Sequence, residues 1–160
     1  GLPNRQLLKD RLEQQIVQAR REDQVGALLY LDLDRFKEIN DVHGHSVGDI
    51  VLTQAAERIT SEVRESDTVA RLGGDEFVLI AEGVTGRDQA HSIAERFLDG
   101  LSLPIEIEGH SISVGASIGV ALTRSAEPDM ALLLRQADMA MYARKRSGRH
   151  GVSFFSAAVA

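Results

Sequence analysis

Two adjacent glycines at positions 73–74 stand between two short runs of strand-forming residues, and this arrangement constrains the fold more than any other feature of the chain. The runs cover residues 67–72 and 77–81. Because glycine adopts positive φ angles at little cost, a Gly-Gly link between such runs is typical of a tight β-hairpin. Asp75 and Glu76 follow the glycines directly. The pattern therefore predicts an antiparallel strand pair with two carboxylates at its tip.

A second acidic pair, Asp32 and Asp34, closes another predicted strand over residues 26–33. The middle of that strand is continuously apolar, which is typical of a strand buried on both faces. Carboxylates at neighbouring strand ends hold a metal more readily than they build a core, and Mg²⁺ in proteins commonly joins carboxylates to nucleotide phosphates. The two acidic pairs therefore predict a Mg²⁺ site, with Mn²⁺ as an alternative ion, and a bound nucleotide.

Apolar residues at helical spacing predict helices elsewhere in the chain. They are a leading helix over 1–22, a short helix over 35–40, a helix capped by Ser46, a helix that begins near Thr85, and a last helix from Pro128 to Gly148. The runs 104–108 and 111–122 predict a second hairpin that turns at Gly109. Without the leading helix and this extra hairpin, the order of elements is βαββαβ. The expected fold class is therefore α+β with a ferredoxin-like core.

Composition limits the kind of protein further. With 160 residues and 43% hydrophobic content, the chain can form one core, so we expect a single domain over 1–160. No apolar run approaches the roughly 20 residues of a membrane helix, and no signal peptide is visible, so we expect no membrane contact by this domain. The absence of cysteine excludes disulfides and fits a cytoplasmic domain. The net charge of −6 argues against nonspecific nucleic-acid binding.

Several separated motifs carry a resemblance to a known family. They are residues 2–5, 31–41 with Gly44-His45 and Gly48-Asp49, 71–77, 117–121, and 137–142 with Lys145 and Gly148-Arg149. In this order, over nearly the whole chain, they resemble the GGDEF domain of bacterial diguanylate cyclases. The resemblance implies a nucleotidyl-cyclase-like palm fold and the condensation of two GTP molecules into cyclic di-GMP with release of pyrophosphate. It also implies a homodimer, because each subunit holds one GTP and therefore half of an active site.

For the metal, the resemblance implies Asp32 and Asp75 as ligands, together with the main-chain carbonyl of Leu33. Two carboxylates about 4 Å apart repel by roughly 4 kcal/mol at an effective dielectric of 20, so a cation between them is favoured over a mere acidic turn. Glu76 is expected to support the site. Either Asp75 or Glu76 is the candidate base for the attacking 3′-hydroxyl, and the sequence does not separate the two. We expect Asp34 to point away from Asp32.

For the triphosphate, the resemblance implies Lys145 and Arg149 at the end of the last helix. The alternative is that these cations only offset the helix macrodipole, an effect of about 0.3–1 kcal/mol. Backbone N–H groups at Phe36 and Lys37 begin a helical turn, which suits an anion. The Lys37 side chain is either a further phosphate ligand or an ordinary surface lysine.

For the base, the resemblance implies Asn40 and Asp49. A carboxylate accepts hydrogen bonds from guanine N1–H and N2–H₂, while an amide can pair with O6 or N3. Adenine lacks those donors, and a site that depends on such a bond rejects the analogue by about 10⁴-fold or more. The alternative for Asp49 is a capping box with Ser46, and both roles can coexist. The alternative for Asn40 is a simple turn residue.

Residues 64–67 match an RxxD site at which the family binds its product. The resemblance implies that Arg64 contacts guanine and phosphate of a cyclic di-GMP dimer and that Asp67 contacts a base edge. RxxD alone is a weak pattern, and an ion pair between Arg64 and Asp67 is the alternative. The spacing to Gly73 favours product binding, and with it product inhibition.

The resemblance leaves three functions open. The first is an active diguanylate cyclase under product inhibition, which the intact signature acids favour. The second is a catalytically weak GTP-binding module that regulates an adjacent cyclic di-GMP phosphodiesterase (EAL) domain. Residues 152–160 resemble the beginning of a linker to such a domain, in a longer protein that can be anchored to a membrane elsewhere. The third is a receptor that binds cyclic di-GMP through Arg64 and Asp67 without turnover of GTP.

Overall fold

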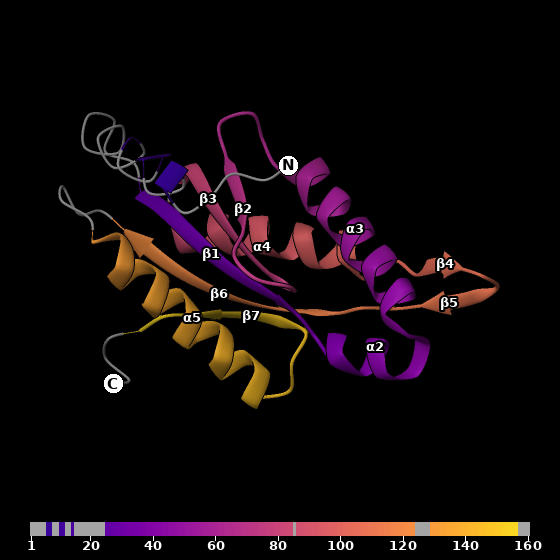
Figure 1. Cartoon of the computed structure of the whole chain (residues 1–160). Helices are drawn as coiled ribbons and strands as arrows, with labels where there is room; N and C mark the ends of the chain where they lie inside the picture. Colours follow the sequence, from indigo (N-terminus) through magenta and orange to yellow (C-terminus); the bar gives the residue numbers. More distant parts are fainter. Residues whose placement is uncertain are drawn as a thin grey trace.

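The structure of the chain is a computed structural model. It describes residues 6, 7, 10, 11, 14, 25–84, 86–123 and 129–156. The elements follow in the order β1 (Val25–Leu33), α2 (Phe36–His43), α3 (His45–Glu62), β2 (Thr68–Arg71), β3 (Glu76–Val84), α4 (Arg87–Leu101), β4 (Ile105–Ile107), β5 (His110–Ile112), β6 (Ala116–Thr123), α5 (Met130–Arg146) and β7 (Gly151–Phe154). In Figure 1 helices α3, α4 and α5 lie against the central sheet, α2 lies beside α3 beyond the end of β1, and the β4–β5 hairpin projects from one end of the molecule.

The predicted leading helix over 1–22 falls mainly outside the described residues. Those that are described there, residues 6, 7, 10, 11 and 14, are helical. In the described part of the chain, no helix has both the length and the apolar character needed to cross a membrane.

Five strands form the central sheet in the order β2-β3-β1-β6-β7. β1 lies in the middle and pairs antiparallel with both β3 and β6, while β2 pairs antiparallel with β3. Strands β1, β2, β3 and β6, with α2 and α3 in the first connection and α4 in the last, form the βαββαβ arrangement. The expected α+β class with a ferredoxin-like core is therefore confirmed.

The sheet is covered on both faces, which explains the unbroken apolar run of β1. Leu29 and Leu31 belong to the larger core, together with residues of α3 and α4. Leu28 and Tyr30 belong to a smaller core on the opposite face, together with residues of α5. Because successive side chains of a strand alternate between faces, a strand between two cores must be apolar at every position.

Helix α5 approaches β6 closely at Gly119. A Cβ at this glycine would stand 2.0 Å from the carbonyl oxygen of Ala137 and 2.2 Å from the backbone nitrogen of Met141. No larger residue fits between the helix and the strand, so the glycine fixes their separation. Since α5 also carries Lys145, this contact helps to determine where that lysine lies relative to β1.

The predicted hairpin at residues 73–74 is confirmed, but its predicted cause is wrong. Arg71 pairs with Phe77, and the amide of Leu72 donates to the carbonyl of Glu76 at 3.0 Å, so residues 73–75 form the turn. Positive φ angles occur at other glycines of the described chain but not at these two. A Cβ at Gly73 would lie 3.2 Å from Glu76 Oε1, which is a tight contact, while a Cβ at Gly74 would meet nothing within 4 Å, so close packing accounts for the first glycine only.

Strand β7 was not predicted. It pairs in parallel with β6, with Ser117 opposite Gly151 and Val120 opposite Phe154. Residues 152–154, expected to begin a linker, are therefore part of the sheet, and a following domain stays a prediction. The run is short and follows closely on α5, so no periodicity indicates it. The predicted strand 111–122 is likewise divided, into β5 and β6.

Helix α3 begins before its predicted start. Its N-cap is Gly44, with φ 89°, and no side chain caps the helix. The expected capping box of Ser46 and Asp49 is therefore absent, because both residues already lie within the helix. Helix α5 is capped by a residue that was not predicted, Asp129, whose carboxylate accepts a hydrogen bond from the amide of Leu132 at 3.2 Å.

Candidate active site

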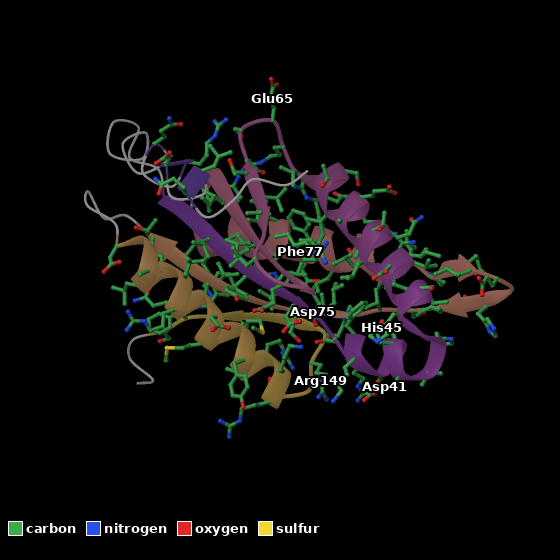
Figure 2. All side chains as sticks on the ribbon, in the orientation of Figure 1. Asp41, His45, Glu65, Asp75, Phe77 and Arg149 are labelled. Atoms are coloured by element: carbon green, nitrogen blue, oxygen red, sulfur yellow. The ribbon has the colours of Figure 1, made fainter. Side chains whose placement is uncertain are left out.

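The acidic residues of the two predicted motifs meet at one end of the central strand. β1 ends at Leu33, whose N–H donates to the carbonyl oxygen of Asp75 at 3.1 Å. Asp32 stands opposite Glu76 in the ladder between β1 and β3. In Figure 2, Asp75 lies near the middle of the molecule, at the end of the β2–β3 hairpin. Segments more than 40 residues apart in sequence thus place three carboxylates in one region.

Asp32 is held in a setting that disfavours its charge. Burial, and then repulsion from Asp75, raises the pKa of Asp32 from 3.8 to about 7, although Lys145 acts in the opposite direction. The Nζ of Lys145 lies 3.4 Å from Asp32 Oδ2. The other oxygen, Oδ1, is buried and has no hydrogen-bond partner among the described residues. A buried carboxylate oxygen without a partner is costly, and Lys145 alone does not offset the burial and the repulsion from Asp75.

The residues present fit a magnesium ion. Within the described part of the chain, no group of three or more His, Cys, Asp or Glu residues is placed to hold a metal by itself. Mg²⁺ does not need such a cage, because it commonly uses one or two carboxylates and completes its coordination with water and substrate phosphates. The unpartnered oxygen of Asp32 and the neighbouring Asp75 are a donor set of that kind.

Glu76 has two neighbours that were not predicted as site residues. The hydroxyl of Tyr30 donates to Glu76 Oε2 at 2.5 Å. On α5, burial and then the charge of Glu76 raise the pKa of Asp138. Both neighbours had a signal in the sequence. Tyr30 stands two residues before Asp32 and so on the same face of the strand, and Asp138 stands two helical turns before Lys145.

The expectation that Asp34 points away from Asp32 is wrong. Lys145 Nζ lies 3.5 Å from Asp34 Oδ1 and is therefore shared by the two carboxylates. Residues two apart in a strand share a face, so the alternation of side chains places both acids on the side covered by α5. Asp34 is only 7% exposed, and it also bonds to Ser117 and His150.

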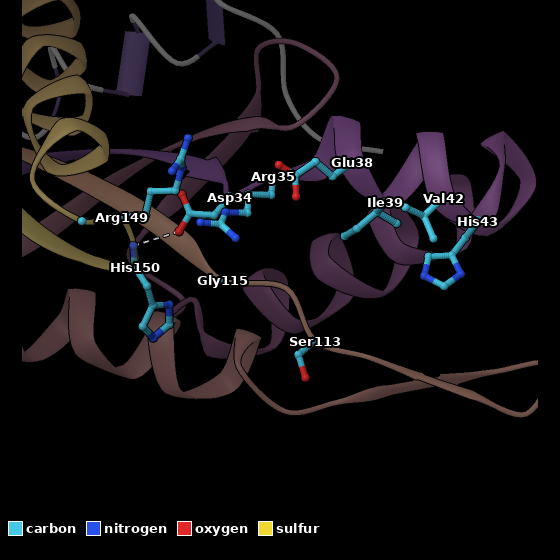
Figure 3. A pocket seen from close by; sticks show the side chains of 11 residues that line it. Asp34, Arg35, Glu38, Ile39, Val42, His43, Ser113, Gly115, Arg149 and His150 are labelled. Atoms are coloured by element: carbon cyan, nitrogen blue, oxygen red, sulfur yellow. Dashed lines mark hydrogen bonds between the residues drawn. The ribbon is translucent and has the colours of Figure 1, made fainter.

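The predicted phosphate ligands divide between the acidic site and the pocket beside it. Lys145 contacts the carboxylates, as described above. Arg149 lines a pocket of about 420 Å³, which Asp34 and Arg35 also line, and Figure 3 shows their side chains there. Phe36 begins α2 and packs partly against the core, while the Lys37 side chain is exposed. Asp34 is thus common to the acidic site and the pocket.

The predicted base ligands, Asn40 and Asp49, lie where α2 and α3 pack together. A Cβ at Gly48 would stand 1.7 Å from Asn40 Oδ1 and 3.4 Å from Phe36 Cζ. The Asn40 amide therefore lies directly over Gly48, next to Asp49 in the chain. Asn40 is half-buried and Asp49 is exposed. The structure brings the two residues to one helix–helix contact.

Arg64 and Asp67 form an ion pair in the turn between α3 and β2. The guanidinium donates twice, from Nη2 to Oδ1 at 2.8 Å and from Nε to Oδ2 at 2.9 Å. The side chain of Asp67 is 1% exposed and that of Arg64 is 33% exposed. The ion pair that the sequence allowed as an alternative is therefore present, and product binding at these residues stays a prediction.

A ferredoxin-like sheet with an acidic pair at the end of its central strand defines the nucleotidyl-cyclase-like palm class. The family model described as "Diguanylate cyclase, GGDEF domain" matches residues 1–151. The chain belongs to this GGDEF domain family, as its motifs imply.

Named relatives and solved structures agree with this assignment. The bifunctional diguanylate cyclase/cyclic di-GMP phosphodiesterase MucR of Pseudomonas aeruginosa is 48% identical over 99% of this chain and 23% of MucR. Diguanylate cyclase TpbB of the same species is 45% identical over 93% of this chain and 34% of TpbB. The crystal structure of the TpbB GGDEF domain matches with a TM-score of 0.90 and 40% identity, covering 98% of both chains. The chain thus spans about a quarter to a third of these curated relatives.

A further solved structure is that of the GGDEF domain of DgcB from Caulobacter crescentus in complex with c-di-GMP. It matches with a TM-score of 0.85 and 27% identity, and the alignment covers 96% of this chain and 91% of the DgcB chain. The fold is therefore preserved between domains that differ at most sequence positions.

Proposed function

We propose that the chain is a diguanylate cyclase domain that condenses two GTP molecules into cyclic di-GMP and pyrophosphate with Mg²⁺, or with Mn²⁺ in its place. One observation carries this proposal: Asp32 is a half-buried acid beside Asp75, with a buried oxygen that has no hydrogen-bond partner among the described residues. Groups held in such unfavourable electrostatic surroundings are concentrated at functional sites. The need for a cation here supports a nucleotide triphosphate as the substrate.

Asp32 and Asp75, with the Leu33 carbonyl, would hold the metal. When bound, the ion supplies positive charge against the triphosphate and makes the α-phosphorus more electrophilic. Lys145 would add a second positive charge, because its ammonium lies 3.4 Å from Asp32 and carries three donors, enough for a carboxylate and a phosphate oxygen together. Arg149 would bind further along the triphosphate, with the backbone N–H groups at the start of α2.

Glu76 is the carboxylate left to accept the proton of the attacking 3′-hydroxyl when Asp75 holds the metal. The Tyr30 hydroxyl donates to Glu76 at 2.5 Å and so restricts its side chain. Phosphoryl transfer depends mainly on positioning and charge stabilisation, so this proton transfer contributes less than the alignment of the two nucleotides. Loss of Glu76 should accordingly slow the reaction less than loss of Asp75.

Asn40 and Asp49 would select guanine, with the carboxylate accepting from the base and the amide over Gly48 pairing with its edge. Each domain would bind one GTP, so the attacking hydroxyl must come from the GTP of a second copy. The reaction therefore requires a homodimer with two facing sites. Because GTP is a cytoplasmic nucleotide, it also requires the domain to face the cytoplasm.

We infer further that cyclic di-GMP inhibits the enzyme by binding at Arg64 and Asp67. The guanidinium of Arg64 is the accessible member of the pair, and the buried carboxylate of Asp67 holds it in one orientation through two hydrogen bonds. A pre-oriented guanidinium loses little freedom when it binds a phosphate or a guanine edge. Arg64→Ala should therefore raise the inhibitory concentration of cyclic di-GMP at least about tenfold while sparing turnover.

The decisive experiment is nucleotide product analysis on a dimer enforced by a fused coiled coil, with Mg²⁺ and either GTP or ATP. We expect cyclic di-GMP from GTP and no cyclic product from ATP. Asp75→Ala should abolish turnover without loss of the far-ultraviolet circular dichroism spectrum, because this side chain belongs to a turn. The matched control is Asp99→Asn, an exposed acid on α4, which should retain activity. An enforced wild-type dimer that makes no cyclic di-GMP contradicts the proposal.

A second function is favoured by one comparison, since MucR carries both cyclase and phosphodiesterase in its name. In that case this domain would bind GTP, turn it over slowly and regulate an adjacent phosphodiesterase. The two functions separate cleanly in the same assay. GTP binding without product in the enforced dimer favours the regulatory module, and cyclic di-GMP formation favours the enzyme.

A further inference from the structure

We propose that Asp34 is a positioning residue that fixes Lys145 and the turn carrying Arg149 in the places where they meet the triphosphate. This inference rests on the proposed function, and it assigns a role to a carboxylate that the sequence motifs leave without one. Asp34 would not touch substrate or metal itself. It would act through the two cations that do.

Both oxygens of Asp34 are engaged by other parts of the chain. Oδ1 accepts a hydrogen bond of 2.7 Å from Ser117 Oγ on β6 and lies 3.5 Å from the ammonium of Lys145 on α5. Oδ2 accepts a hydrogen bond of 2.9 Å from the backbone N–H of His150, drawn as the dashed line in Figure 3. Asp34 is 7% exposed and Ser117 is fully buried. A carboxylate satisfied in this way has little capacity left for a metal.

The turn held by Asp34 has a backbone that does not form without support. Arg149 has φ 62° and His150 has φ 34°, both in the left-handed region, and they follow Gly148 at φ 133°. Consecutive non-glycine residues in this region are costly and persist only when the surroundings hold them. The amide of Arg149 donates to the Arg144 carbonyl at 2.9 Å, while Asp34 holds the next amide. The orientation of Arg149 is thus fixed between α5 and the end of β1.

Gly115 brings the turn and Asp34 into direct contact. A Cβ at this glycine would lie 2.9 Å from His150 Nδ1 and 3.3 Å from Asp34 Oδ2. The amide of Asp34 also donates to the Gly115 carbonyl at 2.8 Å. The carboxylate is therefore held from its own backbone as well as from its oxygens, which is the arrangement required of a residue that positions others.

Simple electrostatics and positioning predict opposite effects for loss of the charge. Asp34 is an anion near the proposed triphosphate site, so if charge alone mattered, Asp34→Asn would tighten nucleotide binding. If Asp34 positions Lys145 and Arg149, the same substitution loosens binding, because the amide keeps only one acceptor oxygen, and either the ammonium or the left-handed turn loses its partner. The sign of the change in affinity therefore decides between them.

The test compares Asp34→Asn, Ser117→Ala and the exposed control Asp99→Asn with the wild-type domain. The probe is guanosine 5′-(α,β-methylene)triphosphate with Mg²⁺, which cannot transfer its α-phosphorus, and its dissociation constant is measured by calorimetry. We expect a loss of affinity of about tenfold for Asp34→Asn and about threefold for Ser117→Ala, as for one or two hydrogen bonds to charged groups. Asp99→Asn should bind within about twofold of wild type.

Two further measurements separate positioning from other roles. Mn²⁺ binding in the absence of nucleotide, followed by electron paramagnetic resonance, should change by less than about twofold in Asp34→Asn, since a metal ligand would lower it by about tenfold or more. In the enforced dimer, KM for GTP should rise with the dissociation constant while kcat changes little. A merely structural defect would instead reduce the active fraction, and so lower apparent kcat at constant KM.

Unchanged or tighter binding of the probe by Asp34→Asn overturns the inference, as does a parallel loss of Mn²⁺ affinity. If Asp34→Asn does not fold, Ser117→Ala carries the test, and wild-type affinity in that variant overturns the inference. The comparison of the variants needs only their affinity for the probe and no turnover of GTP. A wild-type domain that binds the probe but yields no cyclic di-GMP as an enforced dimer therefore refutes the proposed activity and leaves the role of Asp34 to be decided by the variants. A wild-type domain that does not bind the probe overturns both.

Discussion

Asp32→Asn should stabilise the metal-free domain while removing its response to magnesium. The native carboxylate is half-buried beside Asp75, and its pKa is raised from 3.8 to about 7. Between these two values the folded state therefore binds more protons than the unfolded state. The contribution of this group to stability is fully present below about pH 4 and is lost progressively as the pH rises to about 7. Above that pH the ionised acid lowers the free energy of unfolding by a constant amount, and asparagine, which does not ionise, has no such effect.

The size of the effect follows from the pKa. A shift of about 3 units corresponds to about 4 kcal/mol, at about 1.36 kcal/mol for each unit. This is an upper bound, because the side chain is 17% exposed and reached by solvent, and because an amide suits Lys145 less well than a protonated acid does. We therefore expect a gain of about 2 kcal/mol, or a rise in Tm of about 4–8 °C for a domain of this length.

The assay is thermal unfolding followed by circular dichroism in buffers containing a chelator, near pH 8 and again near pH 4.5, where native Asp32 is already protonated and the gain should nearly vanish. The control is Asp41→Asn, an exposed acid on α2, which should leave Tm within about 1 °C. Added Mg²⁺ should raise the Tm that the α,β-methylene analogue gives to the wild-type domain and should leave that of Asp32→Asn with the analogue unchanged.

Two results would refute this reasoning. If Asp32→Asn is less stable than wild type near pH 8 without metal, the ionised carboxylate stabilises the fold through interactions other than the one with Lys145. If the gain is equal at both pH values, it does not arise from ionisation of Asp32. Either outcome would also remove the observation on which the proposed metal site depends.

Three further predictions concern residues that support the site. Arg71 donates to the carbonyl oxygens of both turn glycines, at 3.1 Å and 2.8 Å. Arg71→Ala should therefore loosen the hairpin and lower kcat by about tenfold in steady-state kinetics, while the circular dichroism spectrum stays that of an intact sheet. Gly48→Ala should displace the Asn40 amide, 1.7 Å from the new Cβ, and weaken binding of GTP more than binding of ATP by about tenfold, with a Tm close to that of wild type. Gly119→Ala forces a methyl group to 2.0 Å from a backbone oxygen of α5 and should destabilise the domain by about 2 kcal/mol or more in urea titrations.

The sequence predicts most of the fold because its strongest signals are local and periodic. The apolar run of β1 and the glycine-centred hairpin specify the middle of the sheet, and apolar residues at helical spacing predict the helices. Strand β7 carries no such pattern, since it is four residues long and depends on pairing with β6. Its Phe154 packs against α4, with the Arg87 guanidinium 4.4 Å from the ring centroid. Contacts of that kind depend on tertiary packing and leave no period in the sequence.

The candidate site divides in the same way. Asp32 and Asp75 could be predicted because each stands beside a strand end that the pattern identifies. Asp34 was misplaced because the alternation of the strand was applied with the wrong parity, an error that the shared contact with Lys145 exposes. Its bond to the His150 amide spans 116 residues, and only the folded chain brings such partners together.

The central position of β1 gives the acidic site one fixed half and one adjustable half. Asp32 stands on a strand bonded along both edges, so the whole sheet would have to deform before this carboxylate could move. Asp75 belongs to a turn that pairs along no strand edge: its own carbonyl accepts from the Leu33 N–H, and the carbonyls of residues 73 and 74 accept from the Arg71 guanidinium. We therefore expect the hairpin tip to change more than the strand when a nucleotide binds. We expect the same when substitutions accumulate over evolutionary time, while Asp32 keeps its place in the sheet.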